Sequence, residues 1–124
     1  MNQTSALFNL GNCYLKGDGV PQDKGKAIAL YQRAADLGNT DALFNLGNCY
    51  LKGDGVSQDK KKAFELYDRA ADLGDTEVMV SLALCYLKGE IVPQDKRKAI
   101  ELCQRAATLG NTQAMALLEK GKRK

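Results

Sequence analysis

The chain has 124 residues, of which 44% are hydrophobic and 27% are charged, as is ordinary for a soluble globular domain. No apolar run approaches the ~20 residues that a membrane-spanning helix needs, and no histidine is present, which removes the commonest general base and metal ligand. Residues 1–118 carry 14 basic and 14 acidic side chains, so the net charge of +3 lies in residues 119–124, EKGKRK. This neutral body lacks the basic stripe that a nucleic-acid surface requires, and we expect 119–124 to be a solvated basic C-terminal tail.

A shift of 36 residues aligns the chain with itself without a gap. The segment ALFNLGNCYLKGDGV, residues 6–20, recurs unchanged at 42–56, and a divergent copy, VMVSLALCYLKGEIV, spans 78–92. A fixed internal period of this kind is typical of repeat proteins, in which each unit is one supersecondary element. We therefore place the repeats at 4–39, 40–75 and 76–111, with a partial fourth at 112–118.

The first half of each repeat predicts a helix that ends at a glycine. In repeat one, residues recur at the three- and four-residue spacing of a helix face, and they are Ala6, Leu7, Leu10, Gly11 and Tyr14. Gly17 ends this helix, and the following GDGV supplies a loop in which a positive φ is tolerated. In repeat three Ile91 stands where Gly19 and Gly55 stand, and a β-branched residue disfavours positive φ. We expect a different turn there.

The second half of each repeat predicts another helix. Asp23 is placed to cap it, and Gly38 stops it. The buried stripe of this helix is expected to contain Ala27, Leu30, Tyr31, Ala34 and Leu37. The residues NT before Asp41 then offer a cap for the next helix.

One helical hairpin cannot bury its own apolar face, whereas stacked hairpins can. Gly11, Gly47 and the alanine pairs would let helix backbones approach closely. We therefore predict an all-α fold, an α-α superhelix (solenoid) of three 36-residue helical hairpins plus a C-terminal closing helix, spanning residues 1–118. The first helix of each hairpin would line the concave side.

The string ALFNLGNCYLKGDGVPQDKGKAIALYQRAADLG resembles a Sel1-like repeat, a relative of the tetratricopeptide repeat. The shared features are the LG of helix one, the Y-x-x-G-x-G-V loop, the D-x-x-K-A entry to helix two and the AA-x-x-G exit. The resemblance covers residues 4–118. It implies a non-catalytic scaffold or adaptor that binds other proteins.

Similarity to tetratricopeptide grooves, together with the helical wheel, points to four columns on the concave face. They are Phe8/Phe44/Val80, Asn12/Asn48/Leu84, Leu15/Leu51/Leu87 and Lys16/Lys52/Lys88. The first, second and fourth columns form the predicted partner-binding surface. The asparagine amides both donate and accept hydrogen bonds, so they can bind a peptide backbone. Together with the apolar side chains of these columns, they suit a peptide or helix with apolar anchors. In the alternative interpretation the asparagines are solvated residues inherited by duplication, and neighbouring first helices bury most of the apolar side chains.

The cysteines do not suggest a disulfide or a metal centre. Cys13, Cys49 and Cys85 share one column, and packed helices lie roughly 8–10 Å apart, beyond the ~7 Å between Cα atoms that a disulfide permits. Whether Cys85 can approach Cys103 is left open by the sequence. We expect buried, reduced thiols, which together with the lack of a signal-peptide pattern favours a cytoplasmic location.

No nucleophile–base pair is visible, so we expect no catalysis, no cofactor and no metal. The predicted function is a monomeric protein–protein interaction scaffold that binds neither nucleic acid nor the membrane interior. The alternative is a structural segment of a longer or self-associating solenoid, without a ligand groove of its own.

Overall fold

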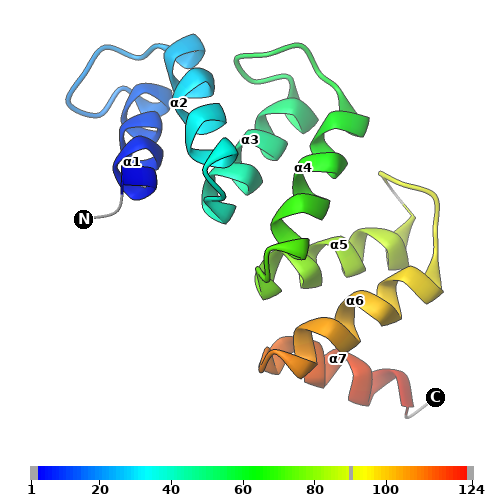
Figure 1. The fold of residues 1–124 in the computed structure, drawn as a ribbon. Helices are drawn as coiled ribbons and strands as arrows, with labels where there is room; N and C mark the ends of the chain where they lie inside the picture. Colours follow the sequence, from blue (N-terminus) through cyan, green and yellow to red (C-terminus); the bar gives the residue numbers. More distant parts are fainter. Residues whose placement is uncertain (1–2, 90, 123–124) are drawn as a thin grey trace. The chain divides into compact units, whose positions relative to one another are not determined.

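The computed structural model describes residues 3–89 and 91–122, with side chains as far as residue 120. Within these ranges the chain forms helices and no strand. The helices are α1 (Gln3–Lys16), α2 (Lys24–Asp36), α3 (Thr40–Lys52), α4 (Lys60–Asp72), α5 (Thr76–Lys88), α6 (Lys96–Thr108) and α7 (Thr112–Lys122) (Figure 1). The all-α class, with three helix pairs followed by one more helix, is confirmed. The last helix runs to Lys122, past the predicted boundary at residue 118.

The helices begin where short polar side chains satisfy the free backbone N–H groups of the first turn. The Asp23 carboxylate accepts a hydrogen bond from the backbone N–H of Lys26 at 3.1 Å, as predicted. Of the two residues NT, Asn39 is the cap, and its side-chain oxygen accepts from the N–H of Ala42 at 2.9 Å. The same role recurs at Asp59, Asp75, Asp95 and Asn111.

The loop inside each repeat is held by glycines and by a glutamine that the sequence analysis missed. Two glycines of the first loop have positive φ, Gly17 at 77° and Gly19 at 75°. The third loop includes Glu90, which lies outside the described residues, so the expectation of a different turn at Ile91 stays a prediction. In all three loops a glutamine side chain donates to a carbonyl in the last turn of the preceding helix, at 2.8–2.9 Å, through the pairs Gln22–Leu15, Gln58–Leu51 and Gln94–Leu87.

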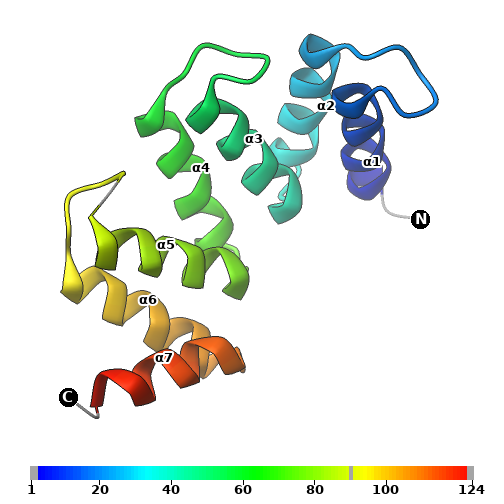
Figure 2. The same cartoon turned by 180° about the vertical axis from the view of Figure 1, so that it is seen from behind.

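The chain divides into two compact units, Met1–Leu73 and Gly74–Lys124. In the first unit, α2 packs against both α1 and α3, and α3 packs in turn against α4. In the second unit, α6 packs against both α5 and α7 (Figures 1 and 2). The assignment of a concave side to the first helices therefore stays a prediction.

Three residues of the predicted stripes are exposed: Ala6, Leu10 and Leu37. Ala27, Tyr31 and Ala34 are fully buried, as expected for the second helix. Leu37, predicted to be buried, is 57% exposed, because α2 ends at Asp36 and the next residue no longer continues the helical stripe. Leu10, also placed on a core-facing stripe, is 42% exposed.

The exposure of Leu10 has a cause that the sequence alone cannot reveal. Its counterpart Leu46 lies in the same fifteen-residue sequence and is 0% exposed. Helix α3 is packed between α2 and α4, whereas the extensive contact of α1 is with α2. Burial at this position is therefore set by the neighbouring helix pair and not by the local sequence.

This difference predicts unequal costs for one substitution made at two sites of identical local sequence. Leu46→Ala should lower the free energy of unfolding by about 2–5 kcal/mol, the usual cost of a core leucine. Leu10→Ala should cost about 1 kcal/mol or less, because solvent already reaches that side chain. Urea denaturation of both variants measures the two values, and equal losses would contradict the packing described.

Candidate partner-binding face

The first helices of repeats one and two lie side by side. The Asn45 amide donates to the Asn12 side-chain oxygen at 3.2 Å, and the Asn39 amide donates to the Thr4 hydroxyl at 3.4 Å. Six predicted site residues are thereby brought onto adjacent helices of one unit, and we call them the α1–α3 face. They are Phe8, Asn12, Lys16, Phe44, Asn48 and Lys52. The two lysines are exposed, and the other four side chains are half-buried.

Behind this face, the second helix of repeat one and that of repeat two each pack a tyrosine against the backbone of the first helix of the same repeat. Tyr31 is 0% exposed and Tyr67 is 6% exposed. A Cβ added at Gly11 would lie 2.8 Å from Cε1 of Tyr31, and one added at Gly47 would lie 2.6 Å from Cε1 of Tyr67. Only glycine allows the ring to lie this close without a shift of the helices.

The same tyrosines contact the aromatic and amide residues of the face. The ring centroids of Phe8 and Tyr31 are 5.9 Å apart, and those of Phe44 and Tyr67 are 5.6 Å apart, within the range of favourable aromatic pairs. The hydroxyl of Tyr31 donates to the side-chain oxygen of Asn12. The hydroxyl of Tyr67 donates in the same way to Asn48. Neither asparagine is simply a solvated residue, because each satisfies a buried hydroxyl.

Repeat three carries a different residue at each position of this arrangement. We call the four columns Phe8/Phe44/Val80, Gly11/Gly47/Ala83, Asn12/Asn48/Leu84 and Tyr31/Tyr67/Cys103 the tyrosine cluster. Where cysteine replaces the tyrosine, no ring excludes a Cβ and no hydroxyl needs an acceptor, so alanine and leucine can stand in the glycine and asparagine columns. The sequence showed each change separately, and only the contacts connect them.

The third-repeat members of the predicted site are not equivalent to the first two. Val80 is 3% exposed, which leaves little of its side chain accessible to a partner. Its β-branched side chain is buried where Phe8 and Phe44 are half-exposed. Leu84 is half-buried and Lys88 is exposed, but both belong to the second compact unit.

The thiols fall into two classes, which corrects the expectation that all four are buried. Cys49 and Cys103 are each 4% exposed, whereas Cys13 and Cys85 are half-buried. Burial raises the pKa of both Cys49 and Cys103 above the ordinary value of 9.0. In the part of the chain that the structure describes, no disulfide forms, and His, Cys, Asp and Glu gather into no group of three or more that could hold a metal.

These features define a helical-hairpin repeat protein, and comparison with known proteins identifies its family. The Sel1 repeat model matches residues 4–39, 40–75 and 76–111, with the boundaries predicted from the internal period. The chain belongs to the Sel1 repeat family. Proteins of this family are generally protein-interaction scaffolds, and each helix in the described ranges is too short or too polar to cross a lipid bilayer.

Solved structures agree with this assignment. A Sel1 repeat protein from Oxalobacter formigenes is 36% identical, with a TM-score of 0.80 over 95% of this chain and 89% of its own. The protective antigen c5321 of uropathogenic Escherichia coli is 36% identical, with a TM-score of 0.78 over 93% of this chain and 25% of its own, so the present chain spans a quarter of that protein. Cysteine-rich protein B of Helicobacter pylori, 22% identical, has a TM-score of 0.70 over 94% of this chain and 97% of its own, and it supports the fold alone. No curated protein matches the sequence.

The buried ionisable groups predict that stability falls in alkaline solution. Burial raises the pKa of Tyr31 above its ordinary value of 10.0, as it raises those of the Cys49 and Cys103 thiols above 9.0. Above these ordinary values the unfolded chain releases protons that the folded chain retains, so the free energy of unfolding must decrease as the pH rises through them. Urea denaturation from about pH 8 to pH 10 measures this slope. The Cys49→Ala/Cys103→Ala variant should have a shallower slope, and stability that rises over this range would contradict the burial of these groups.

Proposed function

We propose that this chain is a protein-interaction scaffold whose α1–α3 face binds an extended or helical segment of a partner protein. The observation that carries the proposal is the repetition of three residue types in register on two adjacent helices, Phe8/Phe44, Asn12/Asn48 and Lys16/Lys52. Membership of the Sel1 repeat family supports the general role. The repeat pattern predicts that this face is the concave one.

The chemistry of the face favours an apolar segment that also carries acceptor groups. The half-exposed rings of Phe8 and Phe44 offer apolar contact to an anchor side chain. The oxygens of Asn12 and Asn48 already accept the tyrosine hydroxyls, while their amide N–H groups donate to no partner among the described residues. These groups would donate to a partner's backbone carbonyls.

The two lysines add a preference for negative charge. Lys16 and Lys52 are exposed and lie in the last turns of α1 and α3. With the amide donors they favour a segment that combines an apolar anchor with a carboxylate.

A charge-neutralising variant tests the proposed face without disturbing the tyrosine cluster. Lys16→Gln/Lys52→Gln should weaken partner binding roughly tenfold, because two exposed ion pairs each contribute up to about 1 kcal/mol. The matched control is Lys60→Gln/Lys61→Gln, which removes two exposed lysines of α4. Partners cross-linked to the wild type in lysate would be identified by mass spectrometry, and their affinities then measured for each variant. Equal affinities for the wild type and both variants would exclude this face.

A further inference from the structure

We propose that this chain associates with further copies of itself through oppositely charged ends of its helical hairpins. The evidence lies in the first compact unit, Met1–Leu73. We call residues 16–26 and 52–62 its loop end, because each range contains the loop that joins the two helices of a repeat. We call residues 29–41 and 65–73 its turn end, because each range contains the last eight residues of a second helix and the residues that follow. The proposal is independent of the proposed function and departs from the monomeric state expected from the sequence.

Every charged side chain of this unit lies in one of the two ends. The loop end carries seven basic and four acidic side chains, and the turn end carries two basic and five acidic ones. The net charges of +3 and −3 cancel, so the neutrality of the unit conceals their separation. In the second compact unit, residues 88–98 again carry four basic and two acidic side chains. An excess of positive charge at the loop therefore recurs in each repeat.

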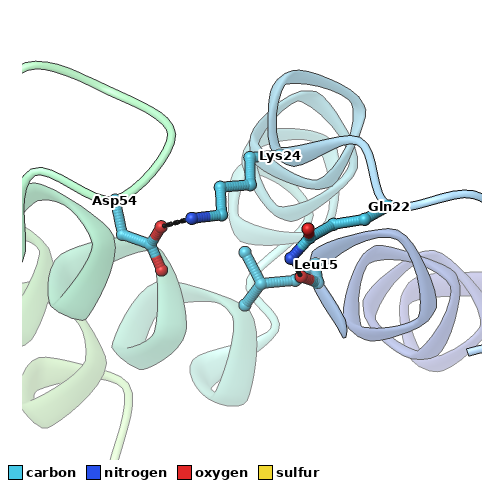
Figure 3. Close-up of polar contacts among 4 residues, drawn as sticks. All are labelled: Leu15, Gln22, Lys24 and Asp54. Carbon is cyan, nitrogen blue, oxygen red and sulfur yellow. Dashed lines mark hydrogen bonds and ion pairs between the residues drawn. The ribbon is translucent and has the colours of Figure 1, made fainter. Parts of the chain in front are cut away.

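The fold gathers the two loops of the first unit at one end of its helices (Figures 1 and 2). The Lys24 ammonium lies 2.7 Å from the Asp54 carboxylate, and this ion pair joins the two loops (Figure 3). Helices α2 and α4 have 13 residues each, so their two ends lie about 20 Å apart. This separation exceeds the Debye length of about 8 Å at physiological ionic strength, so the two ends do not neutralise each other within one copy.

The stability of the hairpins does not account for the lysines of the loop end. Helix α2 begins with KGK and α4 with KKK, and neither has an acidic residue in its first turn. The helix macrodipole disfavours positive charge at that end. Helix α3 has the favourable arrangement, with Asp41 in its first turn and Lys52 in its last. Lys60 and Lys61 are exposed and form no ion pair among the described residues, and an acidic surface of another molecule would supply one.

The turn end adds exposed apolar side chains to its negative charge. Leu37 is 57% exposed and Leu73 is 56% exposed. Each leucine directly follows an exposed aspartate, Asp36 or Asp72. A lysine side chain combines an apolar methylene stem with a charged ammonium, so one lysine of the loop end can contact such a leucine and its aspartate together.

These features together favour a second copy of this chain as the occupant. The loop end and the turn end have equal and opposite net charges, and such complementarity guides association and orientation. A nucleic acid or an anionic membrane would use the loop end and leave the acidic, leucine-bearing turn end without a role. A contact between the loop end of one copy and the turn end of the next is heterologous. It leaves each pair with one free end of each kind, so association continues beyond a dimer.

Sedimentation equilibrium of the full chain at two salt concentrations tests the proposal. At about 10 mM salt, where the Debye length is about 30 Å, the weight-average mass should rise with protein concentration above the 13.5 kDa of the monomer. At about 1 M salt, where it is about 3 Å, the mass should return to that of the monomer. Lys60→Glu/Lys61→Glu should weaken the association roughly tenfold or more. The variant should remain folded, because the macrodipole favours glutamate in the first turn.

A matched control separates the proposed contact from an effect of overall charge. Arg33→Glu/Arg69→Glu gives the same net charge as Lys60→Glu/Lys61→Glu, but it makes the turn end more negative. This control should associate at least as tightly as the wild type. Equal weakening in the control and in the lysine variant would overturn the proposal, as would a wild type that stays monomeric at low salt.

Mixing two variants tests the direction of the contact. Asp36→Lys/Asp41→Lys reverses the charge of the turn end and should be monomeric by itself. Mixed with Lys60→Glu/Lys61→Glu, it should form a one-to-one heterodimer that does not grow, because the mixture retains one unaltered loop end and one unaltered turn end per pair. Circular dichroism of each variant verifies that it is folded before mixing. A mixture that stays monomeric while the wild type associates would show that these ends do not meet and would overturn the proposal.

Discussion

The contact between a second-helix tyrosine and a first-helix glycine sets the geometry of repeats one and two. A Cβ added at Gly11 or Gly47 would lie only 2.6–2.8 Å from the ring of Tyr31 or Tyr67, respectively. This contact fixes how closely each helix pair can pack, and it brings the tyrosine hydroxyl beneath the outer side chains of the first helix. An asparagine one residue after the glycine then accepts that buried hydroxyl, and a phenylalanine three residues before it packs on the ring.

The tyrosine cluster changes how the partner-binding face should be interpreted. Phe44 and Asn48 resemble ligand-binding residues on a helical wheel, yet each also contacts Tyr67. Packing within each repeat explains why this phenylalanine and this asparagine recur in repeats one and two. A partner-binding role for them would be additional to that packing role. Lys16 and Lys52, which are exposed, are therefore the cleaner evidence for a binding role on this face.

Local features of the fold were predictable because short-range physics determines them. The caps at Asp23 and Asn39 and the helix ends before Gly17 and Gly38 follow from backbone hydrogen bonding and glycine conformation. The exposure of Leu10 and the burial of Val80 did not follow, because each depends on which neighbouring element covers the residue. Fifteen identical residues have two different environments in one chain, so no local rule could predict both.

The most direct test of the tyrosine cluster is the effect of Gly47→Ala on stability in two backgrounds. In the wild-type background the added methyl group meets Tyr67, and the substitution should lower the free energy of unfolding by about 1–3 kcal/mol. In a background of Phe44→Val, Asn48→Leu and Tyr67→Cys, the residues found in repeat three, the ring is gone and the higher helix propensity of alanine should leave stability unchanged or raise it by up to about 1 kcal/mol. This reversal is the predicted result of urea denaturation, and an equal loss of stability in both backgrounds would contradict the account.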